Sequence, residues 1–163
     1  MPGETISAMV PLSFVYNNRV GQCMERFIKG LGQKKILGVK CPKCKKVFLP
    51  PRSACGNCFA PLNKWIEVSQ EGTLQNFTVG HVTIVNGEIT NAPSPFIIGM
   101  IRLKNASSLL TAVIKGAGPR ELKAGLTVRA VWKEPPEESL SSLDHFEVVS
   151  LGTRQRRVGH KAR

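Results

Sequence analysis

The sequence has few aromatic residues, few acidic residues and no long apolar run. Its apolar stretches fall well short of the roughly 18 consecutive residues that a membrane-spanning helix needs, so we expect no such helix. Aromatic residues make up 6% of the chain, which argues against a surface that stacks many nucleic-acid bases. The apolar run that ends near Tyr16 has no basic residue before it, so a secretory signal is not expected. We therefore expect a cytoplasmic protein whose thiols stay reduced.

The shortage of acidic residues is concentrated in two segments. The chain has 11 acidic and 23 basic residues, and from Arg26 to Ile66 it has ten basic residues and no acidic one. Residues 152–163 hold five more basic residues, again without an acid, and predict a basic tail. Such a field attracts nucleic acid, a phosphate-bearing cofactor or an acidic protein surface.

What the chain does contain is a series of short elements separated by many of its 15 glycines and 11 prolines, which favours a mainly β fold. Residues 1–36 are expected to form an arm and an amphipathic helix, and residues 37–62 a separate small module. The helix is predicted over Arg19–Leu31 and is expected to end at Gly30 and Gly32. Apolar residues at helical spacing carry this prediction: Val20, Met24, Phe27, Ile28 and Leu31.

Residues 63–151 are predicted to form a small barrel. Alternating or continuous apolar runs predict strands there: 65–68, 73–85, 96–103, 109–114, 126–133 and 146–151. Asn86-Gly87 is a typical hairpin turn, and Pro119–Ala124 is read as one helical turn closed by Gly125. A five- to six-stranded OB-fold barrel is the first choice, and a small sandwich is the second.

Four cysteines form two pairs with metal-binding spacing, Cys41-Pro-Lys-Cys44 and Cys55-Gly-Asn-Cys58. Two residues between paired cysteines let one tight turn, a knuckle, aim both sulfurs at one point. Two facing knuckles then complete a closed tetrahedral shell, which predicts one structural Zn²⁺ and makes residues 37–62 a rubredoxin-like zinc ribbon. A rubredoxin-like iron site or two redox dithiols are the alternatives. Lys45 and Phe59 stand where knuckles often carry a glycine with positive φ, so a somewhat strained or a different loop geometry is expected.

The remaining reactive residues do not form a convincing active site. Cys23 is interpreted as a small packing residue of the helix, with an acyl-accepting nucleophile as the alternative. His81, His145 and His160 are interpreted as surface or strand residues. The segment Gly116–Arg120 suits a turn between barrel elements, and a phosphate cradle is the alternative.

Several short sequence motifs together resemble those of a known family. They are the leader Gly38–Cys44, Val47–Arg52 between the knuckles, the Trp65 strand and Gly72–Val79. With Pro95-Phe96 leading into the next strand, residues 24–151 resemble the acyl-CoA-associated zinc-ribbon/OB-fold proteins, the DUF35 family. The long lead-in, the non-glycine knuckle positions and the basic tail depart from the family pattern.

The resemblance implies a non-catalytic accessory subunit of a thiolase-type complex. A thiolase-like partner, in a two-plus-two assembly, would hold the catalytic residues and make or break a carbon–carbon bond in acyl-CoA. On this chain, basic residues are expected to face a CoA phosphate or an acidic partner: Arg26, Lys29, Lys35, Lys40 and Arg52. Apolar residues are expected to need cover from the partner because one small barrel cannot easily bury them all: Phe27, Ile28, Leu31, Pro50 and Pro51.

Two other functions remain open at this point. Zinc ribbons and OB barrels also bind single-stranded nucleic acid through basic grooves, so a nucleic-acid-binding module is the runner-up. A self-sufficient enzyme that uses Cys23 is the third.

Overall fold

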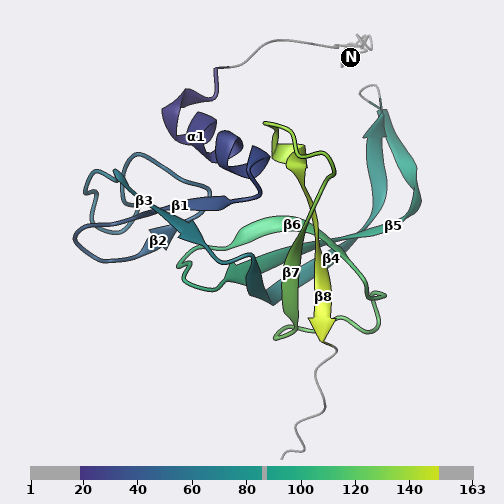
Figure 1. Ribbon diagram of the computed structural model, residues 1–163. Helices are drawn as coiled ribbons and strands as arrows, with labels where there is room; N and C mark the ends of the chain where they lie inside the picture. The colour runs from purple at the N-terminus through teal and green to yellow at the C-terminus, as the bar shows by residue number, and fades with distance from the viewer. Residues whose placement is uncertain (1–18, 86–87, 151–163) are drawn as a thin grey trace, which may run out of the picture.

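The fold has three parts in chain order, a helix, a small three-stranded sheet and a closed five-stranded barrel (Figure 1). The structure is a computed structural model and describes residues 19–85 and 88–150. The predicted mainly β class, with an N-terminal helix before a ribbon and a barrel, is confirmed. No helix within these two ranges is long and apolar enough to cross a membrane.

Helix α1 (Gly21–Gly32) turns one face to the core and the other to solvent. Phe27 and Leu31, which are 3% and 1% exposed, join the main core cluster, and Met24 packs against it. Gly30 does not end the helix as predicted. A Cβ there would lie 2.8 Å from the side chain of Leu37, so this glycine lets β1 pack closely on the helix.

Three short strands form the ribbon sheet, in the order β2-β1-β3. They are β1 (Ile36–Lys40), β2 (Val47–Phe48) and β3 (Lys64–Val68). The strand predicted around residues 65–68 therefore pairs with β1 and not with the barrel, because Val68 faces Ile36 in an antiparallel register. The predicted boundary near residue 63 stays a prediction, while the hydrogen-bonded ribbon sheet extends to Val68.

Five strands close the barrel in the order β4-β5-β6-β8-β7. They are β4 (Glu71–Val85), β5 (Glu88–Leu103), β6 (Leu110–Lys115), β7 (Thr127–Trp132) and β8 (Leu143–Ser150). Only β6 and β8 run parallel. Fully buried side chains from β4, β5, β7 and β8 fill the barrel: Leu74, Ile101, Val128 and Phe146.

The connections agree with prediction at one place and differ at another. Residues 119–124 make the predicted single turn, in which the N–H of Leu122 donates to the carbonyl of Gly118 at 3.3 Å and which does not continue into a longer helix. A short 3-10 helix that was not predicted, η1 (Leu140–Ser142), precedes β8 and touches α1. The predicted Asn86-Gly87 turn lies outside the described residues, but Val85 and Glu88 on either side of it are paired.

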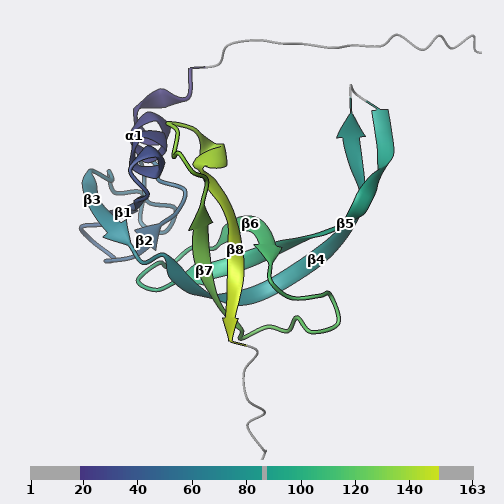
Figure 2. The same cartoon turned by 45° about the vertical axis from the view of Figure 1, so that its right-hand side comes forward.

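Strands β4 and β5 continue far beyond the barrel as a two-stranded arm, defined here as residues 80–85 and 88–96. Figures 1 and 2 show it rising away from the other strands. Strand β6 accompanies β5 only from Ile97 to Ile101, and β7 accompanies β4 only from Glu71 to Thr73. Strand β5 thus starts eight residues before its predicted start at Phe96. Its prolines are tolerated because, among residues 19–85 and 88–150, no further strand pairs with either edge of the arm.

The ribbon is fixed to the barrel by backbone bonds to two serines in the β5–β6 connection. The N–H of Leu49 donates to Ser108 Oγ at 2.6 Å, and that hydroxyl donates to the Leu49 carbonyl at 2.8 Å. The N–H of Val47 donates to Ser107 Oγ at 3.0 Å, and the Ser107 N–H donates to the Val47 carbonyl at 2.8 Å. These reciprocal bonds hold β2 against the barrel.

Candidate metal centre

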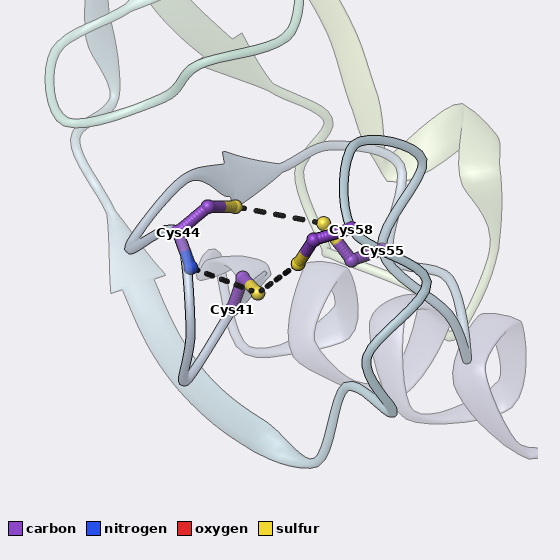
Figure 3. Close-up of side chains that lie close together, drawn as sticks. All are labelled: Cys41, Cys44, Cys55 and Cys58. Carbon is purple, nitrogen blue, oxygen red and sulfur yellow. Dashed lines mark hydrogen bonds between the residues drawn. The ribbon is translucent and has the colours of Figure 1, made fainter.

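The four predicted cysteines converge in one cage between the two knuckles (Figure 3). Their sulfurs all lie within 4.8 Å of one another, with Cys41 Sγ 3.6 Å from Cys58 Sγ and Cys44 Sγ 3.6 Å from Cys55 Sγ. A tetrahedral site with Zn–S bonds of about 2.3 Å has S–S edges of about 3.8 Å, so the cage fits one zinc ion. Four sulfur ligands leave no position for water or substrate, and the site is structural.

Each knuckle is closed by backbone bonds around its first cysteine. The N–H of Lys45 donates to the Cys41 carbonyl, and the N–H of Phe59 donates to the Cys55 carbonyl. Lys45 and Phe59 have φ of 62° and 56°, so both residues take the left-handed conformation that glycine usually supplies. The strained alternative of the predicted loop geometry is therefore confirmed, because both tight turns hold a non-glycine residue at positive φ.

The surroundings of the sulfurs favour a cation. Burial would raise the pKa of the Cys55 thiol, but the N–H groups of Asn57 and Cys58 outweigh it and lower the pKa to about 6. The N–H of Lys46 favours the thiolate of Cys44, yet burial and the neighbouring thiols raise its pKa to about 11. Four thiolates can therefore coexist in this small space only when a bound cation compensates their charge.

The predicted basic residues divide into two groups. Three have partners within the chain: Arg26 lies over the Trp65 ring at 4.7 Å, Arg52 lies over the Phe48 ring at 5.0 Å, and Lys29 pairs with Glu25 at 2.7 Å. The other two differ from each other, since Lys35 is exposed and Lys40 lines a cavity beside the zinc cage. Their role toward CoA or a partner stays a prediction.

The predicted apolar interface needs a correction. Phe27 and Leu31 are buried within the chain, and so is Pro51, because α1 packs directly on the barrel core. The reasoning that these side chains lack cover is therefore wrong, although contact with a partner stays a prediction. Pro50 is exposed, and together with Phe27 and Leu31 it lines a groove of 370 Å³ between α1, η1 and β6.

The structure also places the other candidate groups of the sequence. Cys23 is half-buried on α1, and its thiol makes no hydrogen bond to any residue in the described ranges. The Nδ1–H of His145 donates to the Asp144 carboxylate at 2.6 Å, and Lys115 Nζ lies 3.0 Å from the same carboxylate. The Gly118 N–H donates to the Glu121 carboxylate at 2.8 Å. This carboxylate takes the place that a bound phosphate would need, so the loop is a turn and not a phosphate cradle.

Sequence reasoning did not single out the exposed apolar side chains of the arm. Ile84 and Ile89 are 71% and 76% exposed, and Val82 and Val85 are also exposed. The one available signal was the lack of charge, since between Gly80 and Phe96 Glu88 is the single acidic residue and there is no lysine or arginine.

Comparison with known proteins agrees with this architecture. The family model described as the ChsH2 rubredoxin-like zinc ribbon domain matches residues 29–63, and the ChsH2 C-terminal OB-fold domain matches residues 65–133. A DUF35 domain-containing scaffold protein of Methanocaldococcus jannaschii is 27% identical over 104 residues, which are 63% of this chain and 71% of the relative.

Two solved structures share the fold. A DUF35-family protein of unknown function from Sulfolobus solfataricus has a TM-score of 0.58 and 26% identity, over 78% of this chain and 84% of its own. The Ltp2-ChsH2(DUF35) aldolase has a TM-score of 0.61 and 17% identity, over 82% of this chain and 100% of the matched chain. With its four-cysteine ribbon followed by an OB-fold barrel, the chain belongs to the DUF35 family.

Proposed function

We propose that the chain is a non-catalytic subunit that assembles with a thiolase-like enzyme, supports acyl-CoA binding and thereby supports the making or breaking of a carbon–carbon bond. The partner would hold the catalytic residues, in an assembly of two copies of each chain. The name of the Methanocaldococcus jannaschii relative, a scaffold protein, and that of the aldolase whose fold is shared both support this proposal.

The observation that carries the proposal is the arm. An isolated two-stranded hairpin is at best marginally stable in water, and this one exposes four large aliphatic side chains: Val82, Ile84, Val85 and Ile89. In the part of the chain that the structure describes, no other strand pairs with the edges of the arm, which therefore present backbone groups for pairing. Exposed apolar surface of this kind marks an interaction site. We infer that the arm is the docking element.

The low charge of the arm indicates the properties of the partner surface that would accept it. The chain carries a formal net charge of +12, yet the arm has one formal charge, on Glu88. A surface that accepts the arm should therefore be apolar and weakly charged, as the groove of a large enzyme subunit can be. A second copy of this chain would add another strongly positive body, which disfavours self-association at low salt.

The direct test is co-expression with a thiolase-like enzyme of the same organism, first one encoded next to this gene, followed by gel filtration. We expect one complex peak. The double variant Ile84→Asp/Ile89→Asp should lose that peak but keep its zinc and its melting temperature, because both side chains already face solvent. Phe59→Asp is the matched control, since it removes an 84% exposed aromatic side chain from the ribbon instead.

Two results would contradict the proposal. One is that the wild-type chain and the enzyme elute separately. The other is that the chain alone binds single-stranded DNA or RNA in a salt-sensitive manner, which would favour the nucleic-acid function. Within the described residues, Phe59 is the one strongly exposed aromatic side chain, whereas a base-stacking surface needs several.

A further inference from the structure

Three lysines surround a cavity of 270 Å³ on the outside of the ribbon. Lys40 comes from the end of β1, Lys64 from the start of β3 and Lys45 from the first knuckle, with Cys41 and Pro42 completing the wall. Lys45 Nζ donates to the Pro42 carbonyl at 2.6 Å, which fixes its ammonium group at this wall.

The strand register places two of these lysines against each other. Lys40 and Lys64 are direct partners in the antiparallel β1–β3 pair, so their side chains leave the sheet on the same face. Like charges directly opposite each other destabilise a sheet. No salt bridge within residues 19–85 and 88–150 involves Lys40, Lys45 or Lys64. Within the described residues, none of these three lysines therefore has an acidic side chain as its partner.

The zinc site accounts for only part of this positive charge. Residues 40–64 contain five lysines, one arginine and no acidic residue. A zinc ion with four thiolates carries a net charge of −2. Four positive charges of this segment thus remain without compensation, and a bound anion would supply it.

We propose that this cavity binds the phosphate groups of a nucleotide-type ligand, namely the 3′-phosphorylated ADP end of coenzyme A. The assignment rests on the proposed function, because acyl-CoA is the phosphate-bearing molecule of that reaction. Lysine ammonium groups bind phosphate as point charges and need no fixed fork geometry. The cavity is compact, and the ring of nearby Trp65 is taken by Arg26, which suits a small ligand better than a nucleic-acid strand.

Calorimetric titration of the zinc-loaded full chain with CoA tests the site. Loss of one charged contact to phosphate should weaken CoA binding about 10-fold in Lys40→Gln, Lys45→Gln and Lys64→Gln. Lys123→Gln, on an exposed loop elsewhere, is the matched control and should bind within about 2-fold of wild type. Zinc content and melting temperature, measured on every variant, show that the ribbon stays folded.

Three further titrants separate the sources of phosphate. 3′-Dephospho-CoA should bind more weakly than CoA, and inorganic phosphate more weakly still, if the cavity holds more than one phosphate group. The site is overturned if CoA at about 1 mM gives no binding, if the three variants bind CoA as wild type does, or if inorganic phosphate binds as tightly as CoA. A single-stranded oligonucleotide that binds more tightly than CoA through the same lysines would also overturn it.

The two proposals fail in different experiments. The lysine variants should still assemble with the thiolase-like enzyme, and the Ile84→Asp/Ile89→Asp variant should still bind CoA. Lysine-dependent CoA binding without any assembly would leave the cavity assigned and remove the proposed function. Assembly with the enzyme, when the chain alone does not bind CoA, would support the proposed function and remove the assignment of the cavity.

Discussion

The ring of Phe96 lies directly on the backbone of Gly80, its cross-strand partner. A Cβ at Gly80 would come within 2.4 Å of the ring. Immediately beyond this pair the register shifts, so that Val82 faces Asn91. The pair therefore marks the point at which the arm leaves the barrel, and a bulge next to it bends the two strands. A side chain at position 80 would clash with the Phe96 ring. The glycine therefore lets the ring take the position that sets the direction of the arm.

Substituting Gly80 by alanine should displace this ring and redirect the arm. Such overpacking costs about 1–3 kcal/mol, measured as a lower free energy of unfolding, and assembly with the thiolase-like enzyme should weaken. Gly118→Ala is the matched control, because the nearest atom to its new Cβ would be a Glu121 carboxylate oxygen at 3.4 Å. Unchanged stability and unchanged assembly in Gly80→Ala would show that the pair does not position the arm.

Ser108→Ala should loosen the ribbon from the barrel. Leu49 is 1% exposed, so its N–H and carbonyl would lose their partner hydroxyl where water has little access. The expected cost is about 1–3 kcal/mol in denaturant unfolding. Ser94→Ala, at an exposed position of the arm, should change stability by less than about 0.5 kcal/mol. Equal effects of the two substitutions would refute the role of Ser108.

Zinc removal should unfold the ribbon. The purified protein should contain about one zinc per chain, because the metal contributes on the order of 10 kcal/mol to such a site. A strong chelator, or Cys44→Ser, should therefore give a ribbon that proteases cut and a chain that aggregates. Cys23→Ala should retain the full zinc content, since Cys23 lies outside the cage. Iron in place of zinc in the elemental analysis would reject a zinc site.

Acidification should lower the contribution to stability of Glu71 in β4, which pairs with Lys104 just after β5 and with Arg129 in β7. Lys104 Nζ lies 2.7 Å from one of its carboxylate oxygens and Arg129 Nη2 lies 2.7 Å from the other. Hydrogen bonds and charge from Lys104, then from Arg129, lower the pKa of Glu71 from 4.5 to about 2. The stabilisation is therefore complete above pH 4.5 and disappears as the pH falls toward 2.

Comparison of wild type with Glu71→Gln across this range tests that contribution. Wild type should be the more stable at neutral pH, and the difference should shrink steadily below pH 4.5. High salt should also reduce it, because the three side chains are partly solvent-exposed. A difference that stays constant from neutral pH down to pH 2 would mean that the charge of Glu71 is not involved.

Local patterns in the sequence predicted the parts of the fold that depend on neighbouring residues. The knuckle spacing placed all four zinc ligands, and the apolar alternation near Val128 placed β7. Pairings between distant segments were not predictable in this way. Nothing in the composition of residues 64–68 says that they pair with β1, and helical spacing shows that Phe27 is apolar but not which surface covers it.

The same limit applies to charged residues. The acid-free segment predicted a basic face, but not that Arg26 and Arg52 would lie over aromatic rings of the ribbon. Conversely, Lys45 and Lys64 were part of the counted charge without being chosen as site residues. Only the register of β1 and β3 and the left-handed turn at Lys45 bring them beside Lys40.

This register leads to a prediction about the ligand-free protein. Lys40 and Lys64 repel each other across the β1–β3 pair, so Lys64→Gln should stabilise the ribbon by about 0.2–1 kcal/mol in low salt. The gain should fall as salt is added, because the ammonium groups are near solvent and become screened. Lys43→Gln is the matched control, since this exposed knuckle lysine is not in the β1–β3 register and should give little change. Thermal melts at two salt concentrations measure both effects. A destabilised Lys64→Gln protein would mean that Lys64 already has a favourable partner, and that the two lysines do not form an uncompensated pair.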